Sequence, residues 1–127
     1  MRAGVLFVSP HSENADRLLQ ILSPLPVQLE HVGDLEHARR KLRQEPYRVI
    51  LTDADLPDGG WPDVLDLAHR VSPHSQVIVT TPFADARLWI DALGRGAFDL
   101  LVQPFYPSEV RRILTNACGR RAVGFAS

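Results

Sequence analysis

The chain has 127 residues, of which 45% are hydrophobic and 23% charged, so it can form one domain with a buried core and is too apolar for a disordered protein. Fourteen Lys and Arg residues oppose fifteen Asp and Glu residues, and this balance argues against a protein that binds nucleic acid through a strongly basic surface. The single cysteine, Cys118, cannot form an internal disulfide, and the first apolar run is too short for a signal peptide or a membrane span. We therefore expect a soluble, cytoplasmic domain.

Five short runs rich in Val, Ile and Leu predict β-strands. They are Val5–Val8, Val27–Val32, Val49–Leu51, Val77–Val79 and Leu100–Val102. Four of these runs are continuously apolar, which is typical of strands covered on both faces in a parallel sheet. The run Val27–Val32 mixes polar and apolar residues and predicts an edge strand.

Apolar stripes at helical spacing follow each run and predict five helices. The stripes are Ala15, Leu18, Leu19 and Leu22; Leu35, Ala38 and Leu42; Val64, Leu65, Ala68 and Val71; Ala86, Ile90 and Leu93; and Val110, Ile113, Leu114 and Ala117. Ser12 and Asp34 are predicted N-caps of the first two helices. Pro62 and Pro107 suit the first turns of the third and fifth. Gly94 and Gly96 predict the end of the fourth.

The alternation of strand and helix predicts an α/β fold, with one doubly wound five-stranded parallel sheet covered by helices on both faces. Residues 1–119 are predicted to form this domain, and residues 120–127, which lack periodicity, a tail or the start of a linker. In such folds ligands bind beyond the carboxyl ends of the strands. We therefore expect the site within Ser9–His11, Thr52–Asp55, Thr80–Pro82 and Gln103–Phe105.

Three of these segments, with the strands before them, resemble the receiver domain of two-component response regulators, the CheY-like domain. They are Val49–Pro57, Val77–Thr81 and Gly96–Phe105, and the resemblance extends over residues 4–118. It implies a flavodoxin-like fold of five βα units with strand order 2-1-3-4-5. It also implies a role in phosphorelay signal transduction, with a sensor histidine kinase or another signalling protein as partner.

The resemblance assigns roles to individual residues. Asp53 is the implied phosphoacceptor, and the implied phosphoryl pocket and switch comprise Thr81, Gln103, Pro104 and Ser9. The peptide bond between Gln103 and Pro104 is implied to be cis. Asp53 as a vestigial carboxylate that caps a loop remains an open alternative.

The sequence departs from the receiver pattern at the positions that handle charge. The acidic pair that holds magnesium in receivers aligns with Ser9 and Pro10, and glutamine stands at position 103 in place of lysine. Pro82, after the implied switch threonine, has no backbone N–H to donate. We therefore predict an atypical receiver, weakly phosphorylated or not at all, with no cofactor. Magnesium would need another carboxylate, such as Asp55 or Glu13. A conventional switch phosphorylated at Asp53 is the alternative.

Trp89 lies beside the apolar stripe of the fourth predicted helix. In receivers this position belongs to a surface of the fourth helix, fifth strand and fifth helix that binds partners. Trp89, Leu100 and Tyr106 are therefore predicted to form a homodimer or partner contact; a ring folded over the core is the alternative. No direct binding to nucleic acid or membrane is expected.

Two further functions, a phosphatase and a flavin-binding protein, agree less well with the sequence. Asp53-Ala54-Asp55 resembles the opening motif of haloacid-dehalogenase-type phosphatases, but that motif follows the first strand and its catalytic lysine and second acidic pair are missing. Ser9–Ser12 lacks the glycines of a flavin phosphate loop. His11 is predicted to be a loop residue, with a metal role as the alternative. The sequence therefore predicts a protein that is not an enzyme.

Overall fold

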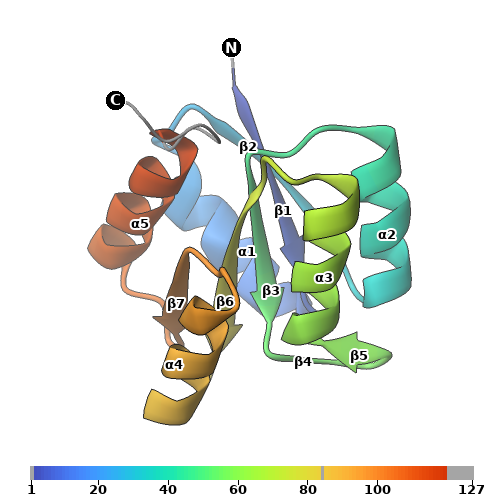
Figure 1. Cartoon of the computed structure of the whole chain (residues 1–127). Coiled ribbons are helices and arrows are strands. Elements are labelled where there is room, and N and C mark those ends of the chain that lie inside the picture. Colours follow the sequence, from blue (N-terminus) through green and yellow to red (C-terminus); the bar gives the residue numbers. More distant parts are fainter. Residues whose placement is uncertain (1, 84, 120–127) are drawn as a thin grey trace.

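The computed structural model describes residues 2–83 and 85–119, which form five parallel strands between two layers of helices (Figure 1). The elements in chain order are β1 (Ala3–Val8), α1 (Ser12–Leu22), β2 (Val27–Val32), α2 (Leu35–Gln44), β3 (Val49–Asp53), β4 (Asp55–Leu56), β5 (Gly59–Gly60), α3 (Trp61–Val71), β6 (Gln76–Thr81), α4 (Ala86–Gly94), β7 (Asp99–Val102) and α5 (Pro107–Gly119). The predicted tail, residues 120–127, lies outside the described residues.

The strand order of the main sheet is β2-β1-β3-β6-β7, and every pair in it is parallel. This confirms the predicted order 2-1-3-4-5 and the edge position of Val27–Val32. The short antiparallel hairpin of β4 and β5, directly after β3, was not predicted. Strands of two residues are too short to leave a periodic signal.

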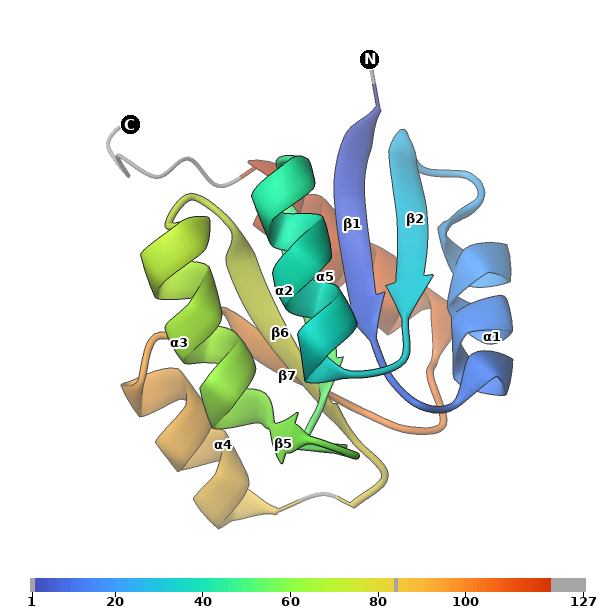
Figure 2. The same cartoon turned by 90° about the vertical axis from the view of Figure 1, so that its right-hand side faces the viewer.

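Each face of the sheet has its own apolar core. In Figure 2, α2 and α3 lie in front of the sheet and α5 lies behind it. The core contacts place α4 with α2 and α3, and α1 with α5. Leu6, Val8, Ile50, Val77 and Val79 pack toward the first group of helices. The alternate residues of the same strands pack toward α1 and α5. Since neighbours along a strand point to opposite faces, these continuously apolar runs supply both cores at once.

Two predicted helix stripes are partly wrong. In α1 the predicted Ala15, Leu18 and Leu22 are buried, but the fourth buried residue is Ile21, and Leu19 is 56% exposed. In α4 only Ala92 is buried and Leu88 half-buried, whereas Ile90 is 73% and Leu93 39% exposed. Because α4 is apolar at most positions, several stripes fit its sequence, and the one that packs is the short row Leu88–Ala92.

The helix ends follow their sequence signals, with one exception. Pro62 lies in the first turn of α3, Pro107 begins α5, and α4 ends at Gly94, just before Gly96 adopts a positive φ of 107°. The exception is Ser12, which is the first residue of α1 and not its cap. His11 occupies the cap position without a side-chain hydrogen bond.

Two carboxylates hold the N-terminus of α2. Asp34 accepts a hydrogen bond of 2.8 Å from the backbone N–H of His37, as predicted for an N-cap. Asp58, between β4 and β5, accepts from the N–H groups of Leu35 at 2.8 Å and Glu36 at 3.1 Å. The hairpin after β3 is therefore bonded directly to α2.

No helix within residues 2–83 and 85–119 is long and apolar enough to cross a membrane.

Candidate functional site

Three polar side chains meet at the carboxyl ends of the three central strands. Asp53 ends β3, Ser9 follows β1 on one side of it, and Thr80 lies in β6 on the other. The Ser9 hydroxyl donates to Oδ2 of Asp53 and the Thr80 hydroxyl donates to Oδ1, each at 2.6 Å. Ser9 and Thr80 are fully buried and Asp53 is 7% exposed. Both carboxylate oxygens thus already have a hydroxyl partner.

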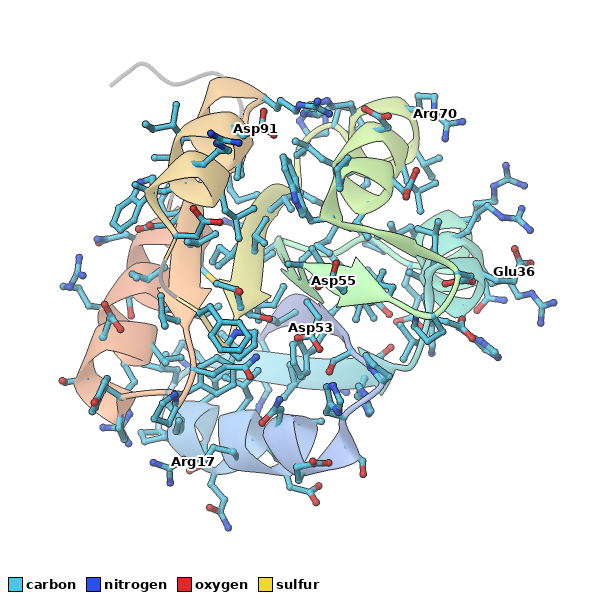
Figure 3. All side chains as sticks on the ribbon, turned by 90° about the horizontal axis from the view of Figure 1, so that it is seen from below. Arg17, Glu36, Asp53, Asp55, Arg70 and Asp91 are labelled. Carbon is cyan, nitrogen blue, oxygen red and sulfur yellow. The ribbon has the colours of Figure 1, made fainter. Side chains whose placement is uncertain are left out.

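Figure 3 views the molecule from the end of the sheet that carries these residues. Asp53 lies near the middle of this view, whereas Arg17, Glu36, Arg70 and Asp91 lie at its periphery. The carboxylate is therefore set among the strand ends and away from the charged rim of the domain.

Backbone hydrogen bonds fix the position of Ser9. Its N–H donates to the carbonyl of Val32 at 2.9 Å, and its hydroxyl accepts from the N–H of His11 at 3.0 Å. Nε2 of His31 lies 2.8 Å from the Ser9 carbonyl, which can only accept, so this ring nitrogen carries the hydrogen. The Ser9 hydroxyl is thus held with its own hydrogen directed at Asp53.

The implied switch threonine, Thr81, bonds elsewhere. Its hydroxyl lies 3.3 Å from both the N–H and the carbonyl of Phe83. Thr80, which sequence reasoning did not single out, is the threonine that reaches Asp53. The signal was the parallel register, which sets Asp53 opposite Thr80 and points Thr81 to the other face.

Gln103 lies at the same end of the sheet. Its N–H donates to the carbonyl of Thr81 at 2.8 Å, and its side-chain oxygen accepts from the Asn14 amide at 3.3 Å. The bond between Gln103 and Pro104 is cis, as the resemblance implied. Gln103 is half-buried and Pro104 is exposed.

The charged groups that could serve a phosphate or a metal lie elsewhere. The only lysine of the chain, Lys41, is in α2, where its Nζ lies 3.1 Å from Glu30 and 3.5 Å from Glu45. Asp55 is exposed in the hairpin. Within residues 2–83 and 85–119, no three His, Cys, Asp or Glu side chains cluster as metal ligands would.

Hydrogen bonds lower the pKa of the Glu30 carboxyl below its ordinary value, chiefly the one donated by the Tyr47 hydroxyl and next that from Lys41. Lys41 is therefore engaged by Glu30 and Glu45 and not by Asp53.

The predicted interface residues differ in their exposure to solvent. Trp89 is 48% exposed and Tyr106 is 65% exposed, so both are available to a partner. The prediction for Leu100 is wrong, because this side chain is only 4% exposed and belongs to the core beneath α2, α3 and α4. Phe83 and Ile90, 75% and 73% exposed, were not predicted as surface residues.

Comparison with known proteins agrees with this architecture. Over 116 residues the chain is 28% identical to the response regulator protein PilR of Pseudomonas aeruginosa, covering 91% of this chain and 26% of PilR. Over 96 residues it is 28% identical to the regulatory protein LuxO of Vibrio cholerae, covering 76% of this chain and 21% of LuxO. The chain thus spans about a quarter of the length of these relatives.

Among solved structures, the signal receiver domain of an HD domain-containing protein from Pseudomonas fluorescens Pf-5 is similar, with a TM-score of 0.83 and 28% identity. The match covers 92% of this chain and 87% of that one. Residues 5–115 match the family model described as the response regulator receiver domain. With its strand order, its cis Gln103–Pro104 bond and an aspartate at the end of β3, the chain belongs to the response regulator receiver domain family.

Proposed function

We propose that this receiver domain acts in phosphorelay signal transduction with a degenerate phosphorylation site, and that it signals mainly through protein–protein contacts. The observation that carries the proposal is the surroundings of Asp53, whose two oxygens accept hydrogen bonds from two neutral hydroxyls, Ser9 and Thr80. The role we propose is that of a signalling module and not of an enzyme.

The charge balance supports slow modification. A phosphoryl group brings about −1.5 to −2 charges at pH 7. Receivers are expected to offset this charge with a magnesium ion and a lysine, but Ser9, Pro10 and Gln103 are all uncharged. The one lysine of the chain is bound to Glu30 and Glu45.

The residues present do not fit a magnesium site of the receiver type. Magnesium prefers near-octahedral coordination by oxygen and is usually held through carboxylates. Here the two side chains bonded to Asp53 are neutral hydroxyls and Asp55 is exposed in the hairpin. Among the described residues, no three His, Cys, Asp or Glu side chains group as metal ligands would. We therefore assign no step to a bound metal.

The transfer itself would disrupt the existing hydrogen bonds. An Asp53 oxygen forms the new bond to phosphorus while the bond from phosphorus to the imidazole nitrogen of a phosphohistidine breaks, and the imidazole takes the electron pair. The attacking oxygen gives up its negative charge to the new bond, so it becomes a weaker acceptor for the hydroxyl that bonds it at 2.6 Å. Each such bond to a charged acceptor is worth about 1.5–3 kcal/mol, so the resting state opposes the reaction.

The test is incubation of the full chain with acetyl phosphate or beryllofluoride and magnesium, followed by intact-mass spectrometry and 19F NMR. We expect slow or absent modification. The triple variant Ser9→Asp, Pro10→Asp, Gln103→Lys should react faster, and Asp53→Asn should not react. Rapid, near-complete modification of the unaltered chain at Asp53 would establish the conventional switch instead.

Exposed apolar side chains support the proposed contact surface. Phe83, Trp89, Ile90 and Tyr106 are each at least 48% exposed and lie on or next to α4, β7 and α5. Large aromatic residues are frequent anchors of protein interfaces. We propose that this surface binds a sensor histidine kinase, another signalling protein or a second copy of the chain.

A further inference from the structure

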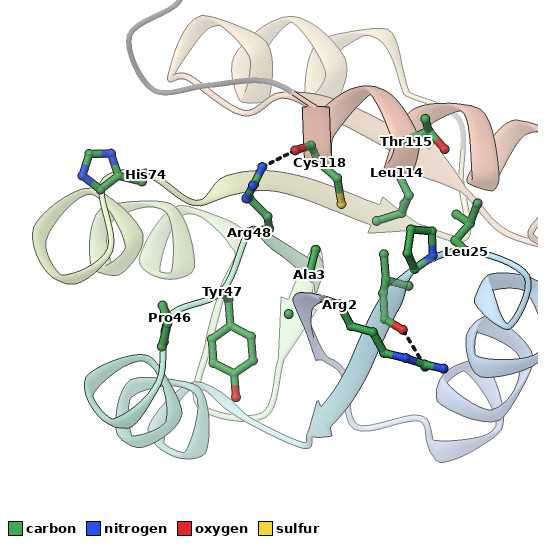
Figure 4. A pocket seen from close by; sticks show the side chains of 13 residues that line it. Arg2, Ala3, Leu25, Pro46, Tyr47, Arg48, His74, Leu114, Thr115 and Cys118 are labelled. Carbon is green, nitrogen blue, oxygen red and sulfur yellow. Dashed lines mark hydrogen bonds between the residues drawn. The ribbon is translucent and has the colours of Figure 1, made fainter.

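A cavity lies at the opposite end of the sheet from Asp53. It has a volume of about 570 Å³, within the range of small-molecule pockets. The beginnings of β1 and β2, the segment before β3 and the last turns of α5 surround it (Figure 4). Residues from five separate stretches of the chain therefore meet here, and none of them belongs to the candidate phosphorylation site.

The walls of the cavity are largely apolar. The half-buried Leu25 contributes one side, and the half-buried Ala3 and Cys118 contribute others. Gly4 lines the cavity as well, where a Cβ would approach the Pro46 carbonyl to 3.2 Å. The cavity thus offers an apolar surface to the body of a ligand.

The charged groups at the cavity have one sign. Its two charged side chains are those of Arg2 and Arg48, and none of the described residues that line it is acidic. Arg2 donates to the carbonyl of Val27 at 3.3 Å, and Arg48 donates to the carbonyl of Cys118. Among residues 2–83 and 85–119 neither arginine forms a salt bridge with a carboxylate. Since a guanidinium carries five N–H donors, both retain donors for an anion.

The neighbouring ionisable groups do not oppose an anion. The Tyr47 ring lines the cavity, but its hydroxyl points away from Arg48 and donates to Glu30 (Figure 4). The Glu30 carboxylate is in turn paired with Lys41. Burial raises the pKa of the Cys118 thiol above its ordinary value, so the thiol is uncharged at pH 7.

From this charge complementarity we propose that the cavity binds a small organic acid, with its apolar body against Leu25 and Cys118 and its carboxylate at Arg2 and Arg48. Arginine pairs well with carboxylates because its planar N–H fork matches their two oxygens. The proposal is independent of any phosphorylation of Asp53.

The experiment is a titration of the 15N-labelled chain with 2-naphthoate, followed by the backbone amide signals in two-dimensional NMR. Saturable shifts are expected at Gly4, Leu25 and Cys118. The cation 2-naphthylmethylammonium, which has the same ring system and the opposite charge, should not saturate these signals.

Variants connect the binding to the cavity. Arg48→Gln or Arg2→Gln should weaken 2-naphthoate binding roughly tenfold, the factor for losing one charge-assisted hydrogen bond. Thr115→Trp, at an exposed lining position, should block the cavity, and Arg112→Gln, exposed on the same helix outside it, should bind normally. Equal binding of the cation, shifts scattered over the surface, or unaltered binding by both arginine variants would overturn the proposal.

Discussion

The hydrogen bond between Thr80 and Asp53 provides the sharpest test of the site's structure. Thr80→Val removes the hydroxyl that donates to Oδ1 at 2.6 Å and keeps a β-branched side chain of similar shape in β6. Asp53 is 7% exposed, so water cannot readily replace the lost donor. The native state at pH 7 should therefore be destabilised.

The size of this effect follows from the kind of bond. A hydrogen bond to a charged acceptor contributes about 1.5–3 kcal/mol, and burial of the added methyl group offsets about 0.8 kcal/mol of that loss. The net destabilisation is about 1–2 kcal/mol. With an m-value of about 2 kcal/mol/M, the midpoint of urea unfolding falls by about 0.5–1 M.

A double-mutant cycle isolates the bond from the methyl effect. In an Asp53→Ala background, Thr80→Val should cost little, because the hydroxyl has lost its acceptor. Thr81→Val is the matched control, since Thr81 is also buried but its hydroxyl bonds only to the Phe83 backbone at 3.3 Å. A coupling energy between positions 53 and 80 below about 0.5 kcal/mol would refute the reasoning.

Two predictions concern other parts of the chain. Trp89→Ala should change the unfolding free energy by less than about 0.5 kcal/mol, as surface substitutions usually do. It should weaken self-association or partner binding, measured by sedimentation velocity. An unchanged distribution of sedimentation coefficients would count against the contact surface. Tyr47→Phe should raise the Glu30 pKa toward its ordinary value, measured by NMR titration, because the tyrosine hydroxyl is the main cause of the depression. A carboxyl whose pKa is lowered by folding stabilises the native state at pH values above its unfolded pKa. The difference in unfolding free energy between wild type and Tyr47→Phe should therefore become smaller as the pH falls through the folded pKa of Glu30. A difference that stays constant with pH would contradict this assignment.

The sheet could be predicted from sequence because its signal is redundant. Continuous apolar runs such as Val49–Leu51 supply both cores, and five of them separated by helical stripes leave few possible topologies. The sequence defines the ends of the strands less closely. The β3 strand, for instance, extends past its apolar run to include Thr52 and Asp53.

The errors arose where pattern alone leaves several packings open. In α4, the predicted stripe of Ala86, Ile90 and Leu93 fits helical spacing as well as Leu88 and Ala92 do, and only packing against the core selects the second pair. Leu100 was predicted to be a surface residue, but its position on β7 beneath the helices buries it in the core.

In the site, the position of Asp53 could be predicted, but its partners could not. Ser9 aligns with a lost acidic residue, and nothing in its type indicates that its hydroxyl donates to Asp53. The choice between Thr80 and Thr81 depends on a register of one residue, which the neighbouring strands fix and the apolar pattern of β6 leaves open.

The attachment of Asp58 to α2 has a mechanical consequence. The hairpin begins two residues after Asp53 and is closed by the hydrogen bond from the Trp61 N–H to the Ala54 carbonyl at 3.0 Å. At its tip, Asp58 accepts hydrogen bonds from the N–H groups of Leu35 and Glu36. Any lateral displacement of this hairpin must either carry the first turn of α2 with it or break two hydrogen bonds there. The tip of the hairpin and the first turn of α2 are therefore expected to move together, on the side of the domain away from α4.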